Sequence, residues 1–128
     1  MHGNELWKSD GTPAGTELVR NIKPGRYPSN PSQLIDVNGT LFFSARSAYG
    51  RAELWKSDGT AAGTKLVKDI YRGSLGSRPS GLTDFDGTLL FFADDGAHPR
   101  SPELHELWRS DGTAAGTKLV KDFYPGTA

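Results

Sequence analysis

The sequence of 128 residues contains no cysteine, which excludes disulfides, cysteine nucleophiles and cysteine-ligated metal sites. It also has no excess of charge: 15 basic and 15 acidic residues balance, so neither nucleic acid nor an anionic membrane is favoured as a partner. Long hydrophobic runs are missing as well. The longest, residues 89–93, is far shorter than the roughly 20 residues of a membrane-spanning helix, and the first residues lack the pattern of a signal peptide.

What the sequence does contain is a repeat. A segment of 18 residues, ELWKSDGTAAGTKLVKDI in its middle copy, begins at Glu5, Glu53 and Glu106. The second and third copies agree at 16 of these positions, and the first and second agree at 14. The stretch between the copies repeats too, which gives a unit of 48 residues with five extra in the later copy. We therefore expect one repeat array over 1–128, with a terminal hairpin at 5–22 and full units at 33–70 and 81–123.

Each full unit predicts four short strands, which in the middle unit are residues 33–38, 40–46, 53–57 and 64–70. The first two are joined by Asn38-Gly39, repeated as Asp86-Gly87 in the next unit, and such pairs favour a two-residue type I′ hairpin turn. No window has the 3.6-residue period of a helix. The prediction is an all-β protein.

The third and fourth strands are joined by a turn that occurs three times. In the middle unit it spans residues 58–63, where the Asp58 carboxylate can accept hydrogen bonds from the following amides. Gly59 and Gly63 are expected to occupy left-handed backbone positions, which glycine adopts without strain. Asp10 and Asp111 repeat this arrangement. One carboxylate per turn is too few for a typical calcium site, so a capping role is favoured over a metal, and no cofactor is expected.

The strands carry bulky apolar residues at adjacent positions, as in Leu41-Phe42-Phe43, which is typical of a sheet covered on both faces. A four-stranded antiparallel sheet covered by neighbours like itself describes a β-propeller blade, so we expect about two and a half blades; a β-sandwich is the alternative. The repeated Trp7, Trp55 and Trp108 are predicted to pack between blades. Because propellers typically have four to eight blades, self-association or neighbouring repeats of a longer chain should complete the ring.

The segment Glu53-Leu54-Trp55-Lys56-Ser57-Asp58-Gly59-Thr60 and its sister copies resemble the bacterial ELWxxDGT repeat family. The resemblance implies propeller-type repeats in a secreted or surface-attached protein, and no established catalytic residues. The Asp-Gly-Thr turn is also similar to the Asp-box of sialidases, where the aspartate pins a hairpin. We therefore expect a module that binds a glycan or protein ligand, or that acts in adhesion or assembly; a fragment of a sialidase-like or other hydrolase propeller is the alternative.

The units differ mainly in the loops that follow their second and fourth strands, and divergent loops on a repeated scaffold are where recognition usually occurs. Both kinds of loop are expected at the end of the sheets opposite the Asp-Gly-Thr turns. A ligand, if bound, should contact basic and aromatic side chains of these loops. The candidates are Arg26, Tyr27, Tyr49, Arg51, Arg72, Arg78, His98 and Arg100. Two histidines without a third ligand do not predict a zinc site.

Overall fold

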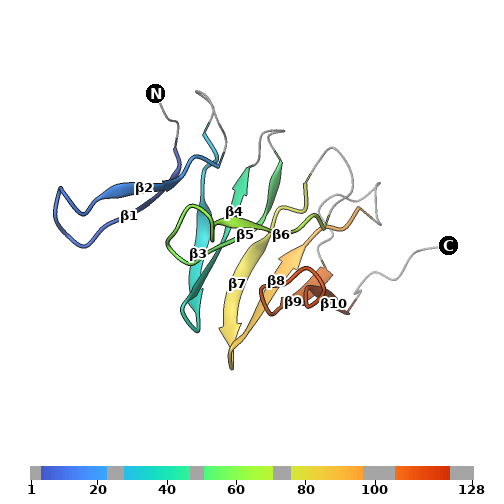
Figure 1. The fold of residues 1–128 in the computed structure, drawn as a ribbon. Coiled ribbons are helices and arrows are strands. Elements are labelled where there is room, and N and C mark those ends of the chain that lie inside the picture. Colours follow the sequence, from blue (N-terminus) through green and yellow to red (C-terminus); the bar gives the residue numbers. More distant parts are fainter. Residues whose placement is uncertain (1–3, 23–27, 47–50, 71–75, 97–105, 122–128) are drawn as a thin grey trace.

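The protein is described by a computed structural model that covers residues 4–22, 28–46, 51–70, 76–96 and 106–121. Within these ranges the prediction of an all-β protein is confirmed, since every regular element is a strand. The strands form three antiparallel sheets of two, four and four members. The sheets lie side by side in chain order between the two termini (Figure 1).

Each sheet is a simple meander in which strands adjacent in the sequence are also adjacent in space. The two-stranded sheet pairs β1 (Leu6–Lys8) with β2 (Glu17–Arg20). The second sheet has the order β3-β4-β5-β6, and the third has the order β7-β8-β9-β10. Their bounds are β3 Ser32–Val37, β4 Thr40–Arg46, β5 Ala52–Ser57, β6 Lys65–Lys68, β7 Ser80–Phe85, β8 Thr88–Ala93, β9 Glu106–Ser110 and β10 Lys118–Lys121.

The predicted hairpin turns are confirmed. Asn38 and Gly39 have φ values of 53° and 87°, and Asp86 and Gly87 have 54° and 85°, as a type I′ turn requires at both central positions. The register between β4 and β5 pairs Leu41 with Ser57, so the turn after β3 and the turn after β5 lie at the same end of the sheet. We call this the turn end and the opposite end the loop end.

Two apolar clusters hold the three sheets together. In the first, Leu6, Val19 and Ile22 of the β1–β2 unit pack against one face of β3–β6. In the second, the other face of β3–β6 packs against β7–β10. The first strands of the two larger sheets, β3 and β7, also contact each other (Figure 1). The members contributed by β3–β6 and β7–β10 are Phe43, Ala45 and Trp55 in the first cluster, and Val37, Phe42, Leu54, Val67, Ile70, Leu89, Phe91, Ala93 and Trp108 in the second.

The two clusters use equivalent positions of the repeat. Leu6 and Val19 in the first cluster correspond to Leu54 and Val67 in the second, so both contacts follow one packing rule. Sheet β3–β6 is covered on both faces, as the paired apolar residues predicted. Among the residues that the structure describes, sheet β7–β10 is covered on one face, and Phe85 on its other face is 65% exposed.

The prediction for the tryptophans is correct for two of the three. Trp55 and Trp108 are each 8% exposed and pack between sheets, whereas Trp7 is 53% exposed, so its predicted packing role is wrong in this structure. The physical reason is its place in the stack: each buried tryptophan faces the preceding unit, and the described chain has no sheet before β1–β2.

Candidate functional site

The turn after β5 is held by a compact set of hydrogen bonds around Asp58. Its Oδ1 accepts from the Thr60 amide at 2.9 Å and from the Thr60 hydroxyl at 2.6 Å, and Thr60 Oγ1 in turn accepts from the Gly63 amide at 2.9 Å. Ser57 and Thr64 close the turn through their hydroxyls, 2.7 Å apart. The same bonds occur around Asp10 and around Asp111. The predicted capping role of all three aspartates is confirmed.

The two glycines of this turn are needed for different reasons. Gly59 has φ +92°, so it occupies a left-handed position as predicted. Gly63 does not have a positive φ, and the prediction for it is wrong. Glycine is needed at position 63 because the Asp58 carboxylate approaches the backbone there: a Cβ at Gly63 would lie 2.0 Å from Asp58 Oδ1. Glycine at this position leaves room for the carboxylate to turn inward.

The hydrogen bonds from Thr60 also hold the pKa of Asp58 below its ordinary value, because they favour the ionised carboxylate. The pKa values of Asp10 and Asp111 are lowered in the same way by Thr12 and Thr113. These carboxylates are thus ionised and already engaged by donors of their own turn. Among the described residues no group of three or more His, Cys, Asp or Glu side chains could hold a metal ion.

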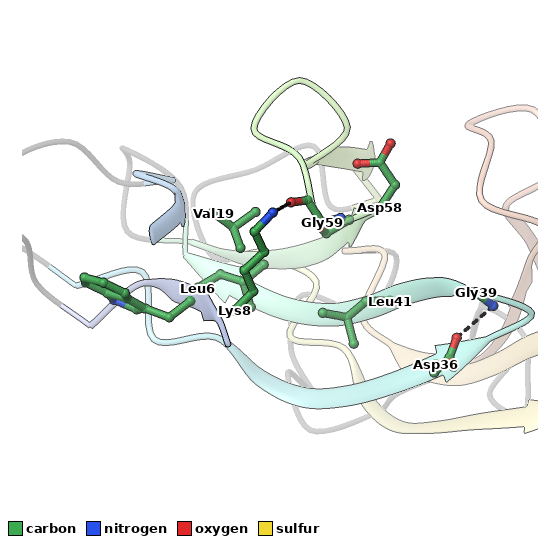
Figure 2. A pocket seen from close by; sticks show the side chains of 10 residues that line it. Leu6, Lys8, Val19, Asp36, Gly39, Leu41, Asp58 and Gly59 are labelled. Carbon is green, nitrogen blue, oxygen red and sulfur yellow. Dashed lines mark hydrogen bonds between the residues drawn. The ribbon is translucent and has the colours of Figure 1, made fainter. Parts of the chain in front are cut away.

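Basic side chains link each unit to the turn of the next. Lys8 Nζ on β1 donates to the Gly59 carbonyl at 2.9 Å (Figure 2), and Lys56 on β5 donates to the Gly112 carbonyl. A second pair repeats the pattern from β2 and β6, where Arg20 donates to the Thr64 carbonyl and Lys68 to the Thr117 carbonyl. Each unit therefore covers the turn of the unit that follows it.

A small cleft of about 220 Å³ lies at the turn end between β1–β2 and β3–β6. Leu6, Val19 and Leu41 give it an apolar lining, and Lys8 and Asp58 also line it (Figure 2). The Lys8 ammonium is already bonded to Gly59, and Asp36 Oδ1 accepts from the Gly39 amide. Lys8 thus joins the two units, and Asp36 and Asp58 hold turns of the second unit, so the polar groups that line the cleft already make structural contacts.

At the loop end, a glutamate and a serine join consecutive units. Glu53, at the start of β5, accepts from the Ser77 amide at 3.1 Å through Oε1 and from the Ser77 hydroxyl through Oε2. The Ser77 carbonyl accepts from the Asp94 amide at 2.8 Å, so Ser77 connects β5 to the end of β8. Glu5 and Ser29 repeat the hydroxyl bond one unit earlier, with Ser29 Oγ donating to Glu5 Oε2 at 2.6 Å, whereas the Ser29 amide donates to the Asn4 carbonyl at 3.0 Å. We call this contact the Glu–Ser latch.

Sequence reasoning missed the latch, although two signals for it were present. Glutamate opens all three copies of the repeat, and Ser29 and Ser77 lie 48 residues apart (77 − 29), each two residues before a proline. A charged residue repeated beside an apolar pair would ordinarily be exposed, yet Glu5, Glu53 and Glu106 are at most 5% exposed. Buried glutamates require buried donors, and the two Ser-Xaa-Pro segments supply them to Glu5 and Glu53.

Burial of Glu53 has a consequence for its ionisation. Desolvation raises the pKa of Glu53 to about 7, against the lowering effect of the hydrogen bonds from Ser77. A pKa near neutrality is also what a general acid of a hydrolase would need. Glu53 is only 5% exposed, however, and both of its oxygens are bonded to Ser77, so the carboxyl has no open access to a substrate.

We expect Glu53→Gln to change the pH dependence of stability. Between about pH 4.5 and 7 the unfolded state releases the Glu53 proton and the folded state retains it, so the wild-type free energy of unfolding falls as pH rises. Glutamine is neutral throughout, and it can accept from the Ser77 amide while donating to the Ser77 hydroxyl. Thermal unfolding at pH 5, 6, 7 and 8 measures this difference. The free energy of unfolding of the variant should rise relative to that of wild type as pH rises, by on the order of 2 kcal/mol.

The matched control is Glu17→Gln. Glu17 is an exposed glutamate on β2, 3.6 Å from Lys8. Its substitution should leave the pH profile parallel to that of wild type, because a screened surface pair contributes little to stability. Parallel profiles for Glu53→Gln as well would show that burial of Glu53 does not affect its ionisation.

The structure locates two of the eight predicted ligand-binding residues. Arg51 is half-buried just before β5, and Arg78 lies just before β7, with its amide donating to the Ala52 carbonyl at 3.1 Å. Their segments therefore meet at the loop end as predicted. The Arg78 guanidinium lies 3.7 Å from the Asp94 carboxylate, yet the side chain is still 46% exposed. The other six, Arg26, Tyr27, Tyr49, Arg72, His98 and Arg100, lie outside the described residues.

Comparison with models of known protein families gives no match, and searches of curated proteins and of solved structures give no significant match. None of the described segments forms a helix long and apolar enough to cross a membrane.

Proposed function

We propose that this chain is a non-enzymatic repeat module of the β-propeller type, in which each four-stranded sheet is a blade, and that it serves a secreted or surface-attached protein in binding, adhesion or assembly. The observation that carries the proposal is the repeated junction: equivalent residues join unit one to unit two and unit two to unit three. Face-to-face packing of similar sheets, with the first strands adjacent, is how propeller blades pack.

A β-sandwich fits these contacts less well. In a sandwich each sheet buries one face against its partner and leaves the other to solvent. Sheet β3–β6 instead has buried residues on both faces, with Phe43 in one cluster and Phe42 in the other. Adjacent residues of β4 are thus covered by different neighbours, which is the expected position of an internal blade.

The loop end is the proposed recognition surface. The turn end is occupied by capping bonds and by the basic links between units, whereas the loop end carries the segments in which the units differ. Arg51 and Arg78 lie there on adjacent segments. An arginine fork can bind a carboxylate or sulfate through two hydrogen bonds, so an acidic glycan is the ligand class we favour. The resemblance to ELWxxDGT repeats supports this surface role.

A glycan array with sulfated and carboxylated members would test this proposal. We expect retention by wild type and at least a tenfold loss of affinity in Arg51→Ala/Arg78→Ala, because both guanidinium groups are removed from the loop end. Lys118→Ala, an exposed cation at the turn end, should bind as wild type does. Equal binding by all three proteins would contradict the assignment. If the protein hydrolysed a fluorogenic glycoside and a single carboxylate substitution abolished that activity, the hydrolase alternative would be favoured over the binding proposal.

A further inference from the structure

We infer that a second copy of this chain docks head to tail, with the outer face of β9–β10 covering Trp7 and the 10–15 turn of the next copy. The inference rests on the proposed stacking of repeat units and names the partner for the two end surfaces. Both internal junctions use equivalent residues of the repeat. The outer side of β1–β2 and the outer face of β9–β10 carry the two complementary halves of a third junction of the same kind.

The tail surface is the outer face of β9–β10. Val19 and Val67, which occupy one position of the repeat, are 7% and 5% exposed because the next unit covers them, whereas Val120 at the same position is 48% exposed. Leu107 corresponds to the buried Leu6 and Leu54 and is only half-buried. The apolar side of a junction is therefore present on β9–β10 with no following unit in the described chain.

The head surface is the outer side of β1–β2. Trp7 is 53% exposed, while its equivalents Trp55 and Trp108 are buried by the preceding unit. The turn beside it shows the same contrast, since Thr16 is exposed and its equivalents Thr64 and Thr117 are fully buried. The first unit thus presents what the second and third units bury against their predecessors.

The polar parts of the junction also match. At each internal junction a cation on the third strand of one unit donates to a turn carbonyl of the next, as Lys8 does to Gly59 and Lys56 to Gly112. Arg109 occupies this position on β9 and is exposed. The corresponding acceptor in a second copy is the Gly11 carbonyl, in a turn with the same hydrogen bonds. The second copy therefore supplies both apolar and polar complements.

The two-stranded head covers only part of the tail sheet. It extends over β9–β10, and Phe85 on β7 lies beyond it, because the described residues of the first unit include no counterparts of β7 and β8. Contact through different surfaces on the two partners is heterologous, so it closes into a ring or continues as an open series. The partial coverage of the tail sheet and the use of different surfaces on the two partners distinguish this docking from a symmetric dimer, in which two exposed sheet faces would meet.

Sedimentation velocity of the full chain would test the inference. Wild type should associate with increasing concentration, and Trp7→Lys and Val120→Asp should each remain at the 13.8 kDa chain mass. Mixed in equal amounts, these two variants should form a 1:1 dimer, because one retains the tail and the other retains the head. Phe85→Asp should associate as wild type does. Unchanged thermal unfolding would show that the variants, all at exposed positions, are folded.

Three outcomes would overturn the inference. Wild type that stays monomeric at all concentrations excludes docking, and a mixture that stays monomeric excludes a heterologous contact. Loss of association in Phe85→Asp shows that the whole sheet face is used, as in a symmetric dimer. The glycan-array comparison changes Arg51 and Arg78, on the segments before β5 and β7, and the docking variants change neither of them. Failure of docking is therefore distinguishable from failure of the proposed function.

Discussion

Trp108→Ala is expected to destabilise the protein by about 3–5 kcal/mol, whereas Trp7→Ala should change the free energy of unfolding by less than about 1 kcal/mol. Both residues occupy the same position of the same motif. Trp108 is 8% exposed in the cluster between the two larger sheets, and Trp7 is 53% exposed. Truncation leaves a cavity only where neighbours surround the side chain. Urea unfolding of the two variants at a concentration where wild type is monomeric measures the difference.

Trp108→Phe separates the contribution of packing from that of the indole nitrogen. Trp108 Nε1 is buried and has no hydrogen-bond partner among the described residues, as is also true of Trp55. An unpaired buried N–H costs roughly 1–3 kcal/mol, so its removal offsets part of the lost volume. We therefore expect Trp108→Phe to cost much less than Trp108→Ala. Equal losses in both variants would show that the indole nitrogen is satisfied in solution.

A neighbouring pair on β8 provides a second comparison. Phe91 is 1% exposed within the cluster, and Phe92, which points to the opposite face, is 40% exposed. Phe91→Ala should approach the loss of Trp108→Ala, and Phe92→Ala should cost well under half of it. Similar losses at both positions would mean that the outer face of β7–β10 is covered in solution, even in the monomer.

Local features of the fold could be predicted from the sequence because their causes are local. Asn38-Gly39 specifies a two-residue turn by its own backbone preferences, and Asp58 caps the turn formed by the next few residues. Adjacent apolar residues on β4 indicated that two neighbours cover this sheet. These patterns predict the strands, the turns and the coverage of this sheet on both faces.

The contacts between units were harder to predict, since they join residues far apart in the chain. The Glu53–Ser77 bond spans 24 positions, and neither residue type in isolation indicates that it is buried. The exposure of Trp7 depends on what lies before it in the stack, which identical motifs cannot reveal. Gly63 was selected correctly for the wrong reason, because a glycine alone does not distinguish a left-handed backbone from a close approach.

Gly63 and Gly59 are needed in the Asp58 turn for different reasons, so their substitutions should couple differently to a substitution of Asp58. Gly63→Ala should cost about 1–3 kcal/mol, because its Cβ would lie 2.0 Å from Asp58 Oδ1 and force the carboxylate away from Thr60. Once Asp58→Ala has removed the carboxylate, the same Cβ meets no such obstacle. In the Asp58→Ala background Gly63→Ala should therefore have little further effect, and the two substitutions should be strongly non-additive.

Gly59→Ala is the matched control in the same turn. A Cβ at Gly59 meets nothing within 4 Å, so its cost of roughly 1–2 kcal/mol should come from backbone strain at φ +92°. Removing the Asp58 carboxylate does not relieve that strain, so Gly59→Ala and Asp58→Ala should add. Urea unfolding of the five variants would measure both couplings. Additivity at Gly63 would show that the carboxylate moves aside without loss, and the turn would then not depend on the inward position of Asp58.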